Sequence, residues 1–144
     1  MTTVIDGSTG ITPAVPVSTA NGGTGLSTPG SANSVLTSDG VNWLSGPGSL
    51  GVGQTWQDVK TTPGRVIGTP YTNTTGRPIA VGITVTINNT ASLTTLTVNG
   101  IVISAVNGTS TGVYTFWLSG IIPAGASYTL NSTTATLTTW AELR

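Results

Sequence analysis

The segment that decides the fold is Arg77-Pro-Ile-Ala-Val-Gly-Ile-Thr-Val-Thr-Ile-Asn-Asn89. Isoleucine and valine alternate at every second position from Ile79 to Ile87, with alanine, glycine and threonine between them. Side chains alternate between the two faces of a strand, so this spacing places all the branched residues on one face. A helix would scatter them around its circumference, and β-branched residues disfavour a helix. The segment therefore predicts a long strand with one buried face.

Shorter runs of the same kind occupy the rest of residues 54–144. Strands are expected at 54–59, 65–69 and 112–119. Asn99-Gly100 separates two β-rich runs and is the pair favoured in a two-residue hairpin, in which both turn residues need a positive φ. No segment shows a helical pattern. The sequence predicts an all-β head at 54–144, built as an antiparallel β-sandwich, jelly-roll-like, or as a barrel.

Residues 1–53 differ in composition from the rest of the chain. They are rich in Gly, Pro, Ser and Thr, and short apolar stretches stand between turn-forming residues. Such a segment cannot bury enough apolar surface by itself to offset its ordering entropy. It predicts an extended N-terminal arm that becomes ordered by packing on another chain. The alternative is a flexible linker. The stretch Leu44-Ser-Gly-Pro-Gly-Ser-Leu-Gly-Val-Gly53 is the expected boundary.

Charge is scarce along the whole chain. Four basic and four acidic residues among 144 give a formal net charge of zero, and 6% of the residues are charged. Typical soluble domains have about a quarter of their residues charged. Other copies or partners are therefore expected to cover much of the surface. Lys60, Arg65, Arg77 and Arg144 do not form the basic cluster that nucleic acid binding needs, so we expect no nucleic acid partner.

The chain contains neither cysteine nor histidine. Disulfides, thiol catalysis, imidazole bases and the usual zinc sites are therefore excluded, and we expect no metal and no cofactor. No apolar run reaches the roughly 20 residues of a membrane-spanning helix. Met1 to Asp6 have neither the basic residue nor the apolar stretch of a signal peptide. We expect synthesis in a cytoplasm, with no export by a signal peptide and no membrane insertion.

Few side chains in the sequence could support catalysis. A glycosidase needs two facing carboxylates about 5 to 10 Å apart, and Asp58 and Glu142 are the candidate pair. Salt bridges to Arg65 or Arg77 are the expected use of these acids instead. Serine and threonine are abundant, but no base is available to activate them. We expect no enzyme and no catalytic residue.

The aromatic residues support a binding hypothesis, because sugar rings stack on aromatic side chains while polar neighbours satisfy their hydroxyls. Ligand binding is assigned to Trp117, Tyr71 and Tyr128, and contacts between copies are assigned to Trp140, Trp43 and Trp56. If Tyr114, Phe116, Leu118 and Leu137 face the core, Trp117 and Trp140 point outward by parity. The alternative, which the composition favours, places these two tryptophans in the core of the protomer or of a trimer.

Two groups of motifs resemble bacteriophage fibre proteins. Ser18-Thr-Ala-Asn-Gly-Gly-Thr-Gly-Leu-Ser-Thr-Pro-Gly30 and Asn33-Ser-Val-Leu-Thr-Ser-Asp-Gly-Val-Asn-Trp43 are similar to a segment of tail-fibre and collar-type proteins. Gly51-Val-Gly-Gln-Thr-Trp-Gln-Asp-Val59, Tyr71-Thr-Asn-Thr-Thr-Gly-Arg-Pro-Ile79 and Trp140-Ala-Glu-Leu-Arg144 resemble a small C-terminal β domain of such fibres. The resemblance spans most of the chain but identifies no catalytic or receptor residue.

The resemblance implies a homotrimeric structural protein of the virion. Residues 1–50 would attach it to another virion protein, and the β head would meet a glycan on the host cell surface. Tail fibres are usually much longer than this chain. A head fibre on the capsid, or a decoration protein with no receptor site of its own, is the alternative.

Overall fold

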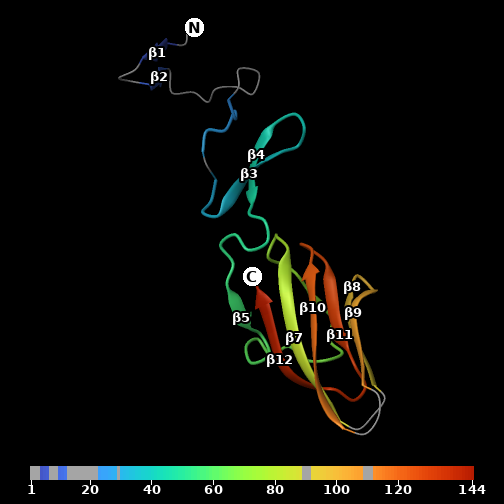
Figure 1. Cartoon of the computed structure of the whole chain (residues 1–144). Helices are drawn as coiled ribbons and strands as arrows, with labels where there is room; N and C mark the ends of the chain where they lie inside the picture. Colours follow the sequence, from blue (N-terminus) through green and yellow to red (C-terminus); the bar gives the residue numbers. More distant parts are fainter. Residues whose placement is uncertain (1–3, 7–9, 13–22, 29, 89–91, 109–111) are drawn as a thin grey trace. The chain divides into compact units, whose positions relative to one another are not determined.

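The computed structural model describes residues 4–6, 10–12, 23–28, 30–88, 92–108 and 112–144, the first two segments as backbone only. The chain divides into two compact units, Met1–Gly48 and Ser49–Arg144 (Figure 1). The division lies within the stretch 44–53 that was expected to hold the boundary, five residues before its end, and residues 50–53 form a turn of the second unit. Residues 1–3, 7–9, 13–22 and 29 of the predicted arm lie outside the described residues.

The first unit contains two antiparallel strand pairs. β1 (Val4–Asp6) pairs with β2 (Gly10–Thr12), and β3 (Ser34–Ser38) pairs with β4 (Trp43–Pro47). Between β3 and β4, Asp39 Oδ1 accepts hydrogen bonds from the backbone N–H groups of Asn42 at 2.6 Å and Val41 at 2.8 Å. These bonds close the turn and lower the pKa of Asp39.

The second unit consists of two four-stranded antiparallel sheets that face each other across one core. Its strands are β5 (Trp56–Asp58), β6 (Tyr71–Thr72), β7 (Ile79–Asn88), β8 (Ser92–Val98), β9 (Ile101–Gly108), β10 (Val113–Ile122), β11 (Ser127–Asn131) and β12 (Thr136–Leu143). The front sheet has the order β10-β7-β12-β5, and the back sheet has the order β6-β11-β8-β9 (Figure 1). The prediction of an all-β chain with antiparallel sheets is confirmed.

β7 is an inner strand of the front sheet, with β10 on one side and β12 on the other. Its isoleucine and valine residues from Ile79 to Ile87 are all buried, as their spacing predicted. The core cluster joins this face to Leu96 and Leu130 of the back sheet. Each such side chain stabilises the fold by about 1.5–3 kcal/mol, so β7 carries a large share of the hydrophobic stabilisation.

The hairpin predicted at Asn99-Gly100 is confirmed. It joins β8 to β9, and the φ angles of the two residues are 48° and 81°. Asn99 Oδ1 also accepts a hydrogen bond from the backbone N–H of Ser127 at 2.9 Å, which fixes the turn against β11.

The strand predicted at 65–69 is wrong. Gly64 and Gly68 have φ angles of 89° and 82°, which place turns at both ends of this segment. Its backbone bonds to other loops and strands instead, from Arg65 N to Val59 O at 2.8 Å and from Gly68 N to Leu130 O at 2.8 Å. The segment therefore runs along the sandwich without joining either sheet.

β12 contains a β-bulge that changes which side chains face the core. Leu137 lies opposite Val85 and Thr139 lies opposite Thr84, so Thr138 is an extra residue without a partner on β7. An extra residue reverses the alternation of all residues that follow it. Trp140 therefore faces the core on the same side as Leu137, opposite Ile83.

Candidate functional site

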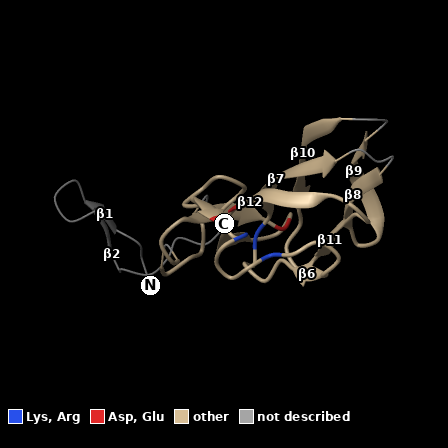
Figure 2. Ribbon diagram, turned by 90° about the horizontal axis from the view of Figure 1, so that it is seen from below, with Lys and Arg blue, Asp and Glu red and all other residues tan. Residues whose placement is uncertain are grey.

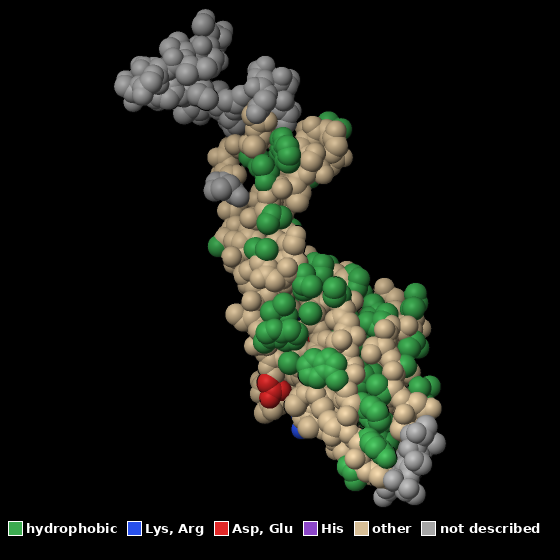
Figure 3. Space-filling view, in the orientation of Figure 1, with side chains coloured by type: hydrophobic (Ala, Val, Ile, Leu, Met, Phe, Trp, Pro, Cys, Tyr) green, Lys and Arg blue, Asp and Glu red, His purple; other side chains and the backbone are tan. Residues whose placement is uncertain are grey.

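The outer surface of the front sheet carries the most prominent exposed aromatic side chains of the second unit. The register places Trp56 of β5, Leu143 of β12, Ala80 of β7 and Ile121 of β10 in one row across all four strands. Trp56 and Ile121 are each 58% exposed. We call this surface, with Trp117 and the small residues between the strands, the outer aromatic face. Figure 3 shows hydrophobic side chains gathered over this sheet.

Trp117 lies on the outer aromatic face because it alternates with the buried Leu118, and its indole lies over Gly82 of β7, the residue diagonal to it in the register. A Cβ atom on Gly82 would lie 2.9 Å from Cζ2 of the indole, closer than real contacts allow. The indole therefore rests on the bare backbone of β7 and is still 64% exposed. Ala141 of β12 and Ser119 of β10 flank Gly82 in the same row. Small residues thus form a shallow floor between Trp117 and Trp56.

The rim of this face, between β5 and β12, is hollowed. A hollow of about 360 Å³ is lined by Trp56, Gln57, Asp58, Lys60, Thr61, Thr138, Thr139, Trp140 and Ala141. Of these, Trp140 itself is fully buried, so it forms the base of the hollow and offers no exposed ring. The remaining side chains combine one large exposed aromatic group with carboxylate, ammonium, amide and hydroxyl groups.

A tight turn after β5 fixes the charged groups of the hollow. Asp58 Oδ2 accepts a hydrogen bond from the Thr61 hydroxyl at 3.1 Å, and Oδ1 accepts one from the backbone N–H of Lys60 at 3.0 Å. The Thr61 hydroxyl, followed by these backbone groups, lowers the pKa of Asp58, so the carboxylate is ionised at neutral pH. Lys60 Nζ donates to the carbonyl of Thr138 at 3.0 Å, across to β12. The hollow thus presents fixed donors and acceptors beside an apolar platform.

Three of the residues predicted for binding or subunit contacts instead form an aromatic cluster inside the second unit. Trp140 is 0% exposed, Tyr128 is buried and Tyr71 is partly buried. The rings of Tyr71 and Trp140 meet edge to face with centroids 5.8 Å apart, and Tyr128 lies 6.3 Å from Trp140. The favoured alternative, a core position for Trp140, is therefore confirmed, whereas the outward orientation expected from parity and the subunit contact assigned to Trp140 are wrong, because the bulge at Thr138 reverses its face. Tyr128 is likewise enclosed and offers no surface to a ligand.

Glu142 is the polar centre of this buried cluster, which the sequence did not reveal. Its Oε1 accepts hydrogen bonds from the Tyr128 hydroxyl at 2.6 Å and from Arg65 Nε at 3.3 Å. Arg144 Nη1 lies 3.2 Å from Oε2 as an ion pair, without the geometry of a hydrogen bond. The guanidinium of Arg65 also stacks 4.0 Å from the Tyr71 ring centroid. The expected salt bridge between Glu142 and Arg65 is confirmed. The buried cluster also connects the loop that carries Arg65 to β11, through Tyr128, and to β12, through Glu142.

The two candidate catalytic acids lie on opposite faces of the front sheet. Asp58 is opposite Ala141 in the register, so it belongs to the outer face. Glu142 is the next residue along β12 and points into the core. A single substrate cannot lie between the two carboxylates in the way a glycosidase requires.

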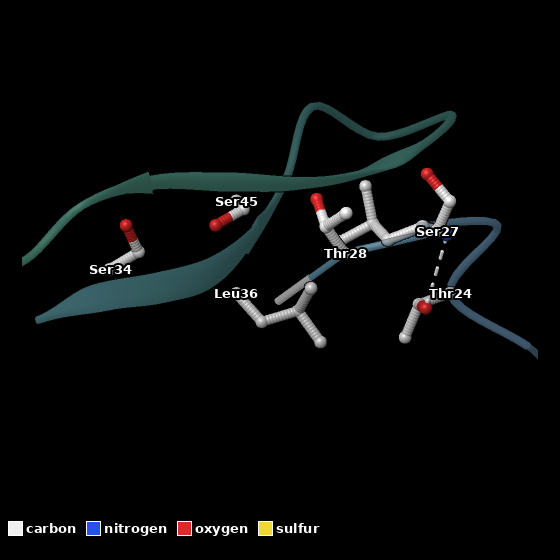
Figure 4. Close-up of a pocket in the computed structure, with 7 residues that line it drawn as sticks. Thr24, Ser27, Thr28, Ser34, Leu36 and Ser45 are labelled. Atoms are coloured by element: carbon white, nitrogen blue, oxygen red, sulfur yellow. Dashed lines mark hydrogen bonds between the residues drawn. The ribbon is translucent and has the colours of Figure 1, made fainter. Parts of the chain in front are cut away.

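Two other residues were predicted for contacts between copies: Trp56, which lies on the outer aromatic face, and Trp43 of the first unit, which is exposed at the start of β4. The other feature of the first unit is an open hollow of about 440 Å³, lined by Thr24, Leu26, Ser27, Thr28, Ser34, Leu36 and Ser45 (Figure 4). Hydroxyl groups and leucine side chains line this hollow, and no charged residue does. Hydroxyls without a base or a charge offer no catalytic chemistry, so we assign this hollow no role.

Comparison with known proteins does not assign the chain to a family. No protein-family model matches it, and no curated protein matches it. In the described residues, no group of three or more His, Cys, Asp or Glu side chains lies together in a way that would hold a metal ion. The same residues include no helix with the length and hydropathy to cross a membrane. The chemistry of the outer aromatic face is therefore the guide to function.

Proposed function

We propose that this chain is a structural, non-enzymatic subunit of a bacteriophage fibre. It acts as a homotrimer whose N-terminal residues 1–50 attach to another virion protein and whose β head binds a glycan on the host cell surface. The observation that carries the proposal is the outer aromatic face, where Trp117 and Trp56 are exposed on one flat sheet with little charge.

The order of the strands supports a jelly-roll head. Strands β5 to β8 alternate between the front and back sheets, and β10 to β12 alternate again after the β8–β9 hairpin. Two four-stranded sheets filled in this way are the arrangement of jelly rolls, which occur in viral capsid and lectin domains. The fold alone does not specify a ligand, so glycan binding is inferred from the residues of the outer aromatic face.

The outer aromatic face has the chemistry that a sugar ring needs. The C–H face of a pyranose can stack on Trp117 or Trp56, and the small residues between them leave the sheet open to a flat ligand. Asp58 and Lys60 lie beside Trp56 and can bond to the hydroxyls of the sugar. A shallow site of this kind binds weakly, and the three heads of a trimer would raise its effective affinity through avidity.

The composition of the first unit supports its role as an attachment arm. Its described residues expose the apolar side chains Leu36, Val41, Trp43 and Leu44. A two-stranded hairpin is at best marginally stable alone in water, so burial of these side chains by a virion protein would stabilise it.

Binding of the full-length protein to an array of bacterial surface polysaccharides tests the proposal. We expect Trp117→Ala and Trp56→Ala each to weaken binding by about tenfold, because one lost aromatic contact corresponds to roughly 1.4 kcal/mol. Val66→Ala removes an equally exposed apolar side chain from a loop and should leave binding unchanged.

Two outcomes would contradict this proposal. If the intact protein binds no surface polysaccharide but still assembles into particles, the decoration reading replaces host attachment. If the two tryptophan variants bind as well as the unchanged protein does, the outer aromatic face is not the glycan site. Sedimentation of each variant checks that its oligomeric state is preserved.

A further inference from the structure

The charged residues of the second unit are confined to one part of it. The sequence contains no charged residue between Arg77 and Glu142, a span that includes β7 to β11. Figure 2 shows the charged residues of the second unit toward β12 and β6, whereas β8, β9 and β10 contain none. One side of the sandwich is therefore free of charge.

One edge strand of each sheet lies on this charge-free side. β10 is the edge of the front sheet and β9 is the edge of the back sheet. The two edges touch, because a Cβ atom on Gly120 of β10 would collide with the side chain of Ile103 of β9. We call this side, formed by β9 and β10, the β9–β10 edge.

Apolar side chains are exposed at both ends of the β9–β10 edge. Ile101, at the start of β9, is 69% exposed, and Val113, at the start of β10, is 67% exposed. Val102, Ile103 and Tyr114 are also exposed between them. β9 ends at Gly108, close in the sequence to Val113 at the start of β10, so Ile101 and Val113 mark opposite ends of the edge.

The backbone of this edge is also unprotected. Each of β9 and β10 pairs with one neighbouring strand among the described residues, so its other side presents free N–H and C=O groups. Proteins usually protect such edges with lysine, inward-facing charges or proline. β9 and β10 contain none of these.

The absence of charge indicates which partner covers the edge. Where identical copies meet around a symmetry axis, a charge near the axis faces the same charge of the other copies, and like charges placed together cost several kcal/mol. A surface without charges avoids this cost when it meets itself, and it gains from burial of its apolar side chains.

We propose that the β9–β10 edge is the surface through which copies of this chain associate. Under the proposed function, on which the number three depends, the edges of three copies meet around a threefold axis. Trp117 belongs to β10, but its indole lies over Gly82 of β7, inward from the free backbone of β10, so the outer aromatic face stays open to ligand when the edge is covered.

Two lysine substitutions test this assignment in the full-length protein. Ile101→Lys and Val113→Lys each place a like charge on every copy at opposite ends of the edge. Each should weaken association by roughly a hundredfold or more, because an unpaired charge would be buried against its own counterpart. Val66→Lys is the matched control, since Val66 is 52% exposed on a loop outside the edge. Sedimentation measures the molecular mass, and circular dichroism checks the fold.

Cross-linking gives a second measurement if a lysine variant fails to fold. The chain has no cysteine, so Ile101→Cys and Val66→Cys each introduce a single reactive thiol. With a flexible bismaleimide linker, Ile101→Cys should join copies efficiently and Val66→Cys should not.

The possible results separate this proposal from the proposed function. A trimer that neither lysine variant weakens overturns the edge and leaves the fibre proposal standing. A dimer that both variants split supports the edge and contradicts the threefold assembly. An unchanged protein that sediments as a single copy at micromolar concentration overturns both.

Discussion

At the scale of single residues, the buried Tyr128–Glu142 hydrogen bond is the most pH-sensitive interaction in the second unit. Burial, followed by the hydrogen bond to Glu142, raises the pKa of Tyr128 well above its usual value of 10.0. The folded state therefore favours the neutral phenol more strongly than the unfolded state does. The stability that this gives is fully present below pH 10 and is lost as the pH rises above it.

We predict that the free energy of unfolding falls above pH 10 by up to about 1.4 kcal/mol per pH unit. Tyr128→Phe should reduce this slope, while lowering stability at pH 7 by about 1–3 kcal/mol because Glu142 Oε1 loses one of its two donors, the Tyr128 hydroxyl. Urea unfolding at several pH values between 8 and 11 measures both effects. The control is Tyr114→Phe, an exposed position, which should keep the full slope. An equally steep slope in Tyr128→Phe would refute the assignment.

At the scale of secondary-structure elements, the β12 bulge determines which aromatic residue enters the core. Thr138 is the extra residue, and its presence lets both Leu137 and Trp140 face inward. Without the bulge, one of the two would have to face outward.

We predict that deletion of Thr138 destabilises the protein by about 3–5 kcal/mol, the range for loss of a buried tryptophan, or prevents folding. Thr138→Ala keeps the number of residues in the strand and should cost under about 1 kcal/mol, because the side chain is exposed. Thermal unfolding followed by tryptophan fluorescence distinguishes the two variants. A deletion variant as stable as Thr138→Ala would show that the bulge can be dispensed with.

At the scale of the whole molecule, the two units have separate interiors. The hydrophobic core consists of residues from Val59 to Trp140, all within the second unit. No residue that the structure describes in the first unit belongs to it. The second unit therefore contains everything that its own packing requires.

We predict that residues 49–144 fold alone, with a cooperative transition whose midpoint lies within about 4 °C of the midpoint of the full chain, a difference of roughly 1 kcal/mol or less. Near-ultraviolet circular dichroism of its tryptophans and a thermal melt measure this. The same fragment should fail to enter virus particles if residues 1–50 are the attachment arm. An unfolded fragment would show that the first unit supports the head, and continued incorporation would exclude the arm as the anchor.

The candidate site was only partly predictable. Parity along β10 placed Trp117 on the outside and Leu118 in the core, as the structure has them, whereas the composition had favoured a core position for Trp117 as well. Gly82 stands between branched residues of β7 in the sequence. Its contact with Trp117 could not be predicted, because that contact depends on the pairing of β10 with β7. The Asp58–Thr61 turn could not be recognised as part of a site from the sequence, because the neighbouring strand β12 completes the hollow around it.

The sequence by itself determined the β class, the buried face of β7 and the Asn99-Gly100 hairpin, because alternation and turn conformation are local properties of the backbone. The tertiary structure decided the order of the strands, the burial of Trp140 and Tyr128, and the pairing of Arg65 with Glu142. These features depend on residues far apart in the chain and on one extra residue in β12. Packing between residues far apart in the chain determines these features, and no local sequence pattern predicts them.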